Sequence, residues 1–173
     1  MGNHSKCVLC KSNESILIQI GVRQAPEVEV HRCMECGLVF LWPRPTKDEL
    51  DRYYVGLYHE ASADLLVHER YRADLDEAGI RVYRLLPFLQ PQTRLLEVGC
   101  GSGAFLEVVR PYVADIVGVE PDVSSRDWIK GRLVLSVVER VADVLRELKR
   151  FDLVVLFHVL EHVLDPVGFL QTL

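Results

Sequence analysis

LLEVGCGSGAFL, residues 95–106, joins an apolar, strand-like segment to a glycine loop and then to a helix-like segment. Its glycines stand at positions 99, 101 and 103. Glycine lets the backbone turn sharply and approach a ligand closely, and a helix that begins there offers unpaired amide groups. The stretch therefore predicts a ligand-binding turn between a strand and a helix.

The rest of the chain after Thr93 alternates in the same way. Strand-like segments at 94–98, 115–120, 133–138 and 151–157 are separated by helix-like segments. Apolar strands joined by helices predict an α/β fold with a Rossmann-like parallel sheet, whose ligands bind beyond the carboxyl ends of the strands. Gly99, Glu120 and His158 each stand at such an end, so we expect them to face one crevice.

The composition argues against two classes of partner. The 173 residues are 49% hydrophobic and 26% charged, with a net charge of −5 and no run of Lys or Arg, which disfavours non-specific nucleic-acid binding. The longest apolar stretch, 153–160, is too short to span a bilayer. The N-terminus shows no apolar signal segment, so we expect a cytoplasmic protein without a membrane partner.

Four of the five cysteines form two matched pairs. Cys7 and Cys10 make one C-x2-C pair, and Cys33 and Cys36 make a second pair after 22 intervening residues. Two such pairs complete a tetrahedral thiolate shell, and two short alternating strands between them are typical of a zinc ribbon. Disulfides are one alternative, which a reducing cytoplasm disfavours. Unrelated buried thiols are the other, but they would not need two matched C-x2-C pairs. We predict a structural zinc without an open coordination position.

The domain organisation follows from these features. We expect the zinc ribbon at 1–42, a linker and helical segment at 43–92, and a Rossmann-like domain at 93–173. The sequence FLWPRPTKDEL is interpreted as the linker, and Thr46 with Glu49 predicts a capping box at the start of a helix. A second helix is expected near 67–86.

The ligand of the glycine loop has two candidates. Gly99, Gly101 and Ala104 also satisfy the dinucleotide fingerprint, and Glu120 lies where a ribose-binding acid belongs. However, Glu97 stands at the mouth of the loop, where its carboxylate would repel a pyrophosphate. S-adenosylmethionine brings a sulfonium and an ammonium instead, and both are cations. Glu97 therefore favours S-adenosylmethionine over NAD.

Three motifs carry a resemblance to a known family. LLEVGCGSGAFL, IVGVEPD and FDLVVLFHVLEHVLDP together resemble the class I S-adenosylmethionine-dependent methyltransferases. More narrowly, the chain is similar to bacterial members with an N-terminal cysteine-rich zinc module, which include deoxysugar C-methyltransferases and other small-molecule methyltransferases. The resemblance implies a small-molecule methyl acceptor, for which a nucleotide-linked sugar is one candidate.

The resemblance also implies a set of cofactor-binding residues. Glu97, Gly99, Gly101 and Gly103 would lie under the methionine end, and Glu120 would bridge the ribose hydroxyls. The cofactor-binding set further includes Cys100, Pro121 and His158, although the Cys100 side chain is expected to pack in the protein. Glu139 is the candidate on the adenine side.

The HVLEH stretch supplies the candidate catalytic residues. We expect His158 to act as a base or to position the acceptor, and His162 is a second candidate whose alternative is a structural pair with Glu161. The stretch also matches an H-x-x-E-H metal motif, which would need His158 and His162 on one helical face. No third ligand is evident nearby in the sequence.

Two expectations concern what surrounds the sheet. The resembled fold has seven strands, and only four are visible before Leu173, so the methyltransferase fold is expected to be C-terminally incomplete, as in a fragment of a longer enzyme. The segment 151–157 would then be an exposed apolar edge strand, which favours self-association. A non-catalytic cofactor-binding or partner-binding module and an NAD-dependent oxidoreductase are the alternative functions.

Overall fold

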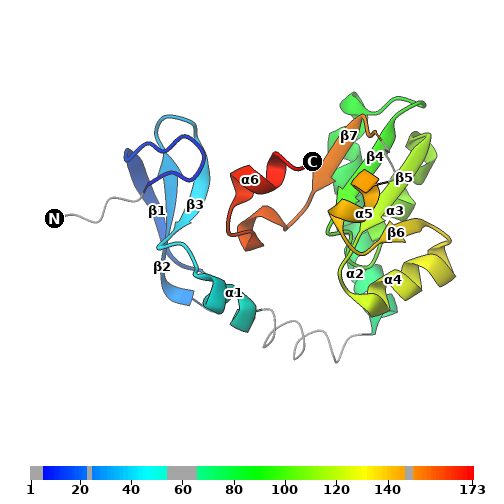
Figure 1. The fold of residues 1–173 in the computed structure, drawn as a ribbon, viewed down its shortest axis with the longest axis horizontal. Coiled ribbons are helices and arrows are strands. Elements are labelled where there is room, and N and C mark those ends of the chain that lie inside the picture. The colour runs from blue at the N-terminus through cyan, green and yellow to red at the C-terminus, as the bar shows by residue number, and fades with distance from the viewer. Residues whose placement is uncertain (1–5, 23–24, 54–65, 147–149) are drawn as a thin grey trace. The chain divides into compact units, whose positions relative to one another are not determined.

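The computed structural model describes residues 6–22, 25–53, 66–146 and 150–173. The chain divides into two compact units (Figure 1). The first comprises Met1–Leu57 and Glu161–Thr172, and the second comprises Tyr58–Leu160 with Leu173. Each unit has its own sheet, so each is described separately.

The first unit contains an antiparallel sheet of three strands in the order β1-β2-β3. The strands are β1 (Ser15–Val22), β2 (Ala25–Cys33) and β3 (Val39–Trp42). The prediction of two strands followed by a linker from Phe40 is wrong, because Val39–Trp42 pairs with β2. The physical reason is burial: Phe40 packs with Cys7 and Cys33 in the small core of this unit.

Two short helices of the first unit begin at side-chain caps. The helix α1 (Lys47–Tyr53) follows Thr46, whose backbone N–H donates to Glu49 Oε2 at 2.7 Å, while the Glu49 N–H donates back to Thr46 Oγ1 at 3.3 Å. This confirms the capping box. The helix α6 (Pro166–Leu170) is capped by Asp165, which accepts from the Gly168 N–H at 3.0 Å.

The second unit contains the predicted parallel sheet, in the order β6-β5-β4-β7 (Figure 1). Its strands are β4 (Arg94–Val98), β5 (Asp115–Val119), β6 (Ser136–Val138) and β7 (Leu153–Leu156). Val98 is level with both Val119 and Leu156, so the carboxyl ends of the three neighbouring strands meet at one edge. The strands β6 and β7 are the two edge strands of the described sheet.

Helices connect and cover these strands. They are α2 (Val67–Leu85), α3 (Ala104–Val109), α4 (Val123–Trp128) and α5 (Val141–Arg146), with the short turns η2 (Leu86–Phe88) and η3 (Arg110–Tyr112). The turn η5 (Leu160–His162) spans the sequence boundary between the two units. Side chains from α2, α3 and the sheet share one apolar core, which includes Ala78, Leu95 and Leu106. None of the helices described here has the length and apolar content needed to cross a bilayer.

One predicted strand is shorter than expected. The sequence favoured a strand over 133–138, but the ladder contains only Ser136–Val138. The preceding residues form a π-helical turn, η4 (Ile129–Leu133), that extends α4, and Val134 then has a positive φ of 54°. Leu133 and Leu135 are buried, so their apolar character reflects packing of this turn in the core and not strand pairing.

Candidate cofactor site and cysteine cluster

The glycine loop is a left-handed turn at the carboxyl end of β4. Gly99, Gly101 and Gly103 have φ values of +75°, +53° and +79°. A Cβ at Gly99 would lie 2.5 Å from Val159 Cγ2, so a side chain there is excluded by packing as well as by backbone conformation. A Cβ at Gly101 would meet no heavy atom within 4 Å, so the space beside this residue is open.

Glu97 is the next-to-last residue of β4, and Val98 separates it from the loop. Its side chain is only 2% exposed, and its Oε2 atom is buried without a hydrogen-bond partner. Burial raises the pKa of Glu97 to about 8; the charges of Glu120 and Asp74 add to the increase, and the cation of Arg81 opposes it. A buried carboxylate oxygen without a partner is suited to a cationic or hydrogen-bond-donating ligand.

Glu120, at the end of β5, joins its strand to the loop. Its Oε2 accepts a hydrogen bond from the Gly101 N–H at 2.8 Å, and its Oε1 accepts one from the Asp122 N–H at 2.9 Å. The pKa of Glu120 is raised by burial, which outweighs these two amide bonds. The structure thus brings Glu97, the glycine loop and Glu120 together, as the sequence predicted from the strand ends.

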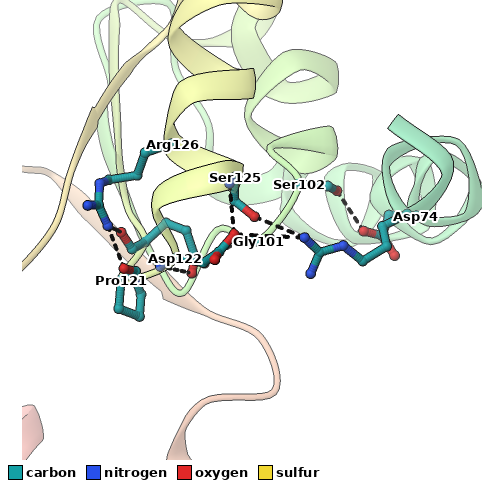
Figure 2. Close-up of polar contacts among 9 residues, drawn as sticks. Asp74, Gly101, Ser102, Pro121, Asp122, Ser125 and Arg126 are labelled. Atoms are coloured by element: carbon teal, nitrogen blue, oxygen red, sulfur yellow. Dashed lines mark hydrogen bonds and ion pairs between the residues drawn. The ribbon is translucent and has the colours of Figure 1, made fainter. Parts of the chain in front are cut away.

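Two polar residues of α2 also reach this site, and the sequence reasoning missed both. Ser102 Oγ donates to Asp74 Oδ2 at 2.6 Å, a bond visible in Figure 2. Arg70 Nη2 donates to Ser125 Oγ at 3.2 Å. An Arg and an Asp four positions apart usually indicate an ion pair on a solvated helix face, so the pattern gave no signal of this role.

Cys100 and Pro121 differ in burial. Cys100 is 6% exposed and belongs to the core, where a Cβ at Gly118 would lie 2.6 Å from its Sγ. Its side chain therefore faces β5, and burial raises the pKa of its thiol. Pro121 is exposed, and its carbonyl accepts a hydrogen bond from Arg126 Nη1 at 2.6 Å.

The candidate on the adenine side is Glu139. Its carboxylate is exposed and lies 3.8 Å from Arg126 Nη2.

The two candidate catalytic histidines lie in different units. His158 follows β7 in the second unit, is exposed, and has a positive φ of 55°. His162 ends the short 3-10 turn η5 and belongs to the first unit. The two residues do not share an α-helical face, as the H-x-x-E-H motif would require. Their catalytic roles stay predictions.

The four paired cysteines of the first unit converge on one point. All four Sγ atoms lie within 4.8 Å of one another, with Cys7 and Cys36 at 3.6 Å and Cys10 and Cys33 at 3.4 Å. A disulfide would hold two sulfurs at about 2.05 Å, so the thiols are free. Sulfurs bound to one tetrahedral zinc stand roughly 3.8 Å apart, from bonds of about 2.3 Å. The cluster therefore has the geometry of a metal site.

The cysteine cluster is the one candidate metal site among the described residues. Across residues 6–22, 25–53, 66–146 and 150–173, no other group of three or more His, Cys, Asp or Glu side chains is arranged to hold a metal ion. The turn after Cys36 is completed by Gly37, whose φ is +76°, and the Gly37 N–H donates to the Cys33 carbonyl at 3.1 Å. This tight turn lets both thiols of the second pair face the same centre.

Comparison with known proteins agrees with the parallel sheet and its glycine loop. Residues 68–173 match the family model described as a methyltransferase domain, and the chain belongs to that family. The ubiquinone biosynthesis O-methyltransferase of Rhodopseudomonas palustris (strain BisA53) is 29% identical over 82 residues, which are 44% of this chain and 32% of that protein. The protein of the same description from Cereibacter sphaeroides is 35% identical over 85 residues, or 44% and 34% of the two chains. The match thus spans about a third of each of these two relatives.

Two solved structures match part of the chain. One is Streptomyces venezuelae DesVI, which is 18% identical, has a TM-score of 0.41, and is matched over 59% of this chain and 52% of its own. The other is described as an S-adenosylmethionine-dependent methyltransferase from Archaeoglobus fulgidus. It is 24% identical with a TM-score of 0.37, over 54% of this chain and 38% of its own.

Proposed function

We propose that the protein is an S-adenosylmethionine-dependent methyltransferase, or the cofactor-binding part of one, that acts on a small molecule. The observation that carries the proposal is Glu97, a buried carboxyl with an unpartnered oxygen, which Val98 separates from the glycine loop. Membership of the methyltransferase-domain family supports the reaction class. The matched relatives are described as O-methyltransferases of ubiquinone biosynthesis, which favours a small-molecule acceptor.

The electrostatics of the site favour this cofactor over a dinucleotide. The negative charges of Glu120 and Asp74 both raise the pKa of Glu97, so three acidic side chains lie near the glycine loop. A cation bound there would lower the raised pKa of Glu97 and pair with its ionised carboxylate, as the ammonium and sulfonium of S-adenosylmethionine could, whereas a pyrophosphate would raise that pKa further. When bound, this cofactor supplies a methyl group activated by the positive sulfur.

Each residue would have a separate task. Glu97 would hold the cationic methionine end, and the open space beside Gly101 would admit the ligand close to the backbone. Glu120 would accept the ribose hydroxyls with the lone pairs left by its two amide bonds. His158, exposed after β7, would take the acceptor proton or orient the acceptor.

The proposal also covers the methyl acceptor and the pairing of the edge strand β7. A nucleotide-linked sugar or a phenol is the acceptor class to test first. The edge position of β7 leaves one side of that strand without a partner in the described sheet, which favours pairing with another chain segment or a second copy.

The cysteine cluster would hold a structural zinc. Cys7, Cys10, Cys33 and Cys36 would fill all four tetrahedral positions, so the ion would stabilise the first unit and would have no open position for chemistry. The core of this unit beyond the cysteines consists of Phe40 with Leu38 packed against it. Such a small core supports a folding role for the metal.

A binding experiment tests the cofactor assignment. Calorimetric titration of the protein should show binding of S-adenosylhomocysteine and none of NAD. Gly101→Val should abolish that binding, because Val strains the positive φ and occupies the open space. Gly131→Val is the matched control, because Gly131 also has open space but lacks a positive φ. NAD binding, or unchanged affinity in Gly101→Val, would contradict the assignment.

A turnover experiment separates an enzyme from a non-catalytic binding module. Methyl-donor consumption should be screened against sugar nucleotides and phenols. Binding of S-adenosylhomocysteine combined with no consumption for any acceptor, in a protein that extends to the length of the matched relatives, would favour the binding module.

A further inference from the structure

Helix α2 presents two opposite charges to two different loops of the cofactor site. Asp74 Oδ2 accepts from Ser102 Oγ, in the middle of the glycine loop, at 2.6 Å. Arg70 Nη2 donates to Ser125 Oγ at 3.2 Å and lies 3.9 Å from Asp122 Oδ2. Residues four apart share one helix face, so one face of α2 contacts both the β4–α3 loop and the β5–α4 turn (Figure 2).

These contacts differ from ordinary surface pairs. Arg70 and Asp74 have the spacing at which opposite charges normally pair with each other, yet each is hydrogen-bonded to a different loop. The serines that they bind are 3% exposed at Ser102 and 0% exposed at Ser125. Removal of either partner would leave a buried hydroxyl unsatisfied, which is costly.

The two contacts complete a closed ring that includes the proposed cofactor ligands. Asp74 binds Ser102, the neighbour of Gly101, and the Gly101 N–H is bound by Glu120. The other oxygen of Glu120 accepts from the Asp122 N–H, and Asp122 lies beside Arg70. The ring thus returns to α2, one turn from its start.

We propose that Arg70 and Asp74 are positioning residues of the cofactor site, which hold Gly101 and Glu120 at the spacing that the cofactor requires. The inference rests on the proposed cofactor. Gly101 and Gly103 flank Ser102 with positive φ values, so the loop backbone itself is permissive. The bond to α2 restricts this freedom before the ligand arrives, and pre-organisation of this kind raises affinity.

The test is a double-mutant cycle on the affinity for S-adenosylhomocysteine, measured by calorimetry on the whole chain. Asp74→Ala and Ser102→Ala should each weaken binding about tenfold, the loss expected for a charge-assisted hydrogen bond. The double variant should bind no more weakly than the single variants, because both changes remove the same bond. Asp74→Asn keeps an acceptor oxygen and should recover most of the affinity. Asp76→Ala, at another exposed acid of the same helix, should bind like the wild type.

A second measurement separates positioning from general stability. The thermal midpoint of each variant is recorded without ligand, and Asp74→Asn and Ser102→Ala serve if Asp74→Ala does not fold. Affinity losses that are coupled in the cycle and recovered by Asn support the inference. Wild-type affinity in Asp74→Ala and Ser102→Ala, or additive losses that follow the thermal midpoint, overturns it. If the wild-type protein does not bind the ligand, the proposed cofactor fails and this inference fails with it.

Discussion

The two units of the molecule reach a folded state by different means. The first unit has a core of Cys7, Cys33 and Phe40, while Ile16, Leu17, Ile18 and Ile20 of its first strand are about half exposed or more. The second unit buries a continuous cluster of fifteen residues between its sheet and helices. Burial of apolar area suffices for the second core, whereas the first has too little of it. From this comparison we expect the folding of the first unit to depend on a metal at the cysteine cluster, and the folding of the second unit not to.

Removal of the metal is the strongest way to test this contrast. A chelator, or Cys33→Ser, should unfold the first unit, because zinc binding to such sites provides about 10 kcal/mol or more of folding free energy. The second unit should keep its unfolding transition. Elemental analysis and circular dichroism during chelation check both points. Freshly purified protein without zinc, or a ribbon that survives chelation, would show that the first unit folds by other means.

A cavity in the second core should have the next largest effect. Leu106 is 0% exposed, and Leu106→Ala should lower the free energy of unfolding of the second unit by about 2–5 kcal/mol. Zinc content should not change. Urea unfolding measures the loss, and Leu86→Ala, at an exposed leucine of the same unit, is the control. A loss as small as that of the control would mean that this core is not what holds the unit together.

The buried acid of the second unit should make its stability depend on pH. The pKa of Glu97 is raised from an ordinary value of 4.5 to about 8. Between these values the folded state binds more protons than the unfolded state, so stability falls as pH rises, by up to about 1.4 kcal/mol per pH unit. Glu97→Gln should remove this slope.

The measurement is urea unfolding of wild type and Glu97→Gln at several values between pH 5 and pH 8, without ligand. The advantage of the Gln variant should grow with pH. Parallel stability curves for the two proteins would place the pKa of Glu97 in the folded state near its ordinary value.

A smaller effect is expected at the second carboxylate. Glu120→Ala should weaken the binding of S-adenosylhomocysteine by about 1–3 kcal/mol, the usual loss for hydrogen bonds to a charged acceptor. It also removes the acceptor of the Gly101 and Asp122 amides, so Glu120→Gln separates charge from hydrogen bonding. Calorimetry gives the affinities. An unchanged dissociation constant in Glu120→Ala would remove this residue from the binding site.

The parts predictable from the sequence are those that depend on local chemistry. The glycine loop, the cysteine pairs and the capping box at Thr46 each need particular residue types at fixed spacing. The convergence of Glu97 and Glu120 followed from the level ends of parallel strands. Each of these inferences needed no knowledge of how distant side chains pack.

The parts that sequence could not predict depend on tertiary contacts. Phe40 appeared to begin a linker, because only its packing on the cysteine core reveals a third strand. The apolar residues Leu133 and Leu135 are as compatible with a strand as with the π-helical turn that ends at Leu133. Arg70 and Asp74 look like a solvated ion pair until the loops that they bind are placed.

The close contact between Gly99 and Val159 has a consequence for protein engineering. A glycine loop of this kind invites transfer to other strand–turn–helix scaffolds as a short cassette. Here Gly99 packs against Val159, which follows the strand β7. A Cβ added at Gly99 would lie only 2.5 Å from Val159 Cγ2. A grafted cassette would therefore have to include the exit of β7 together with residues 95–106, and a library that varies the loop would have to vary position 159 with it.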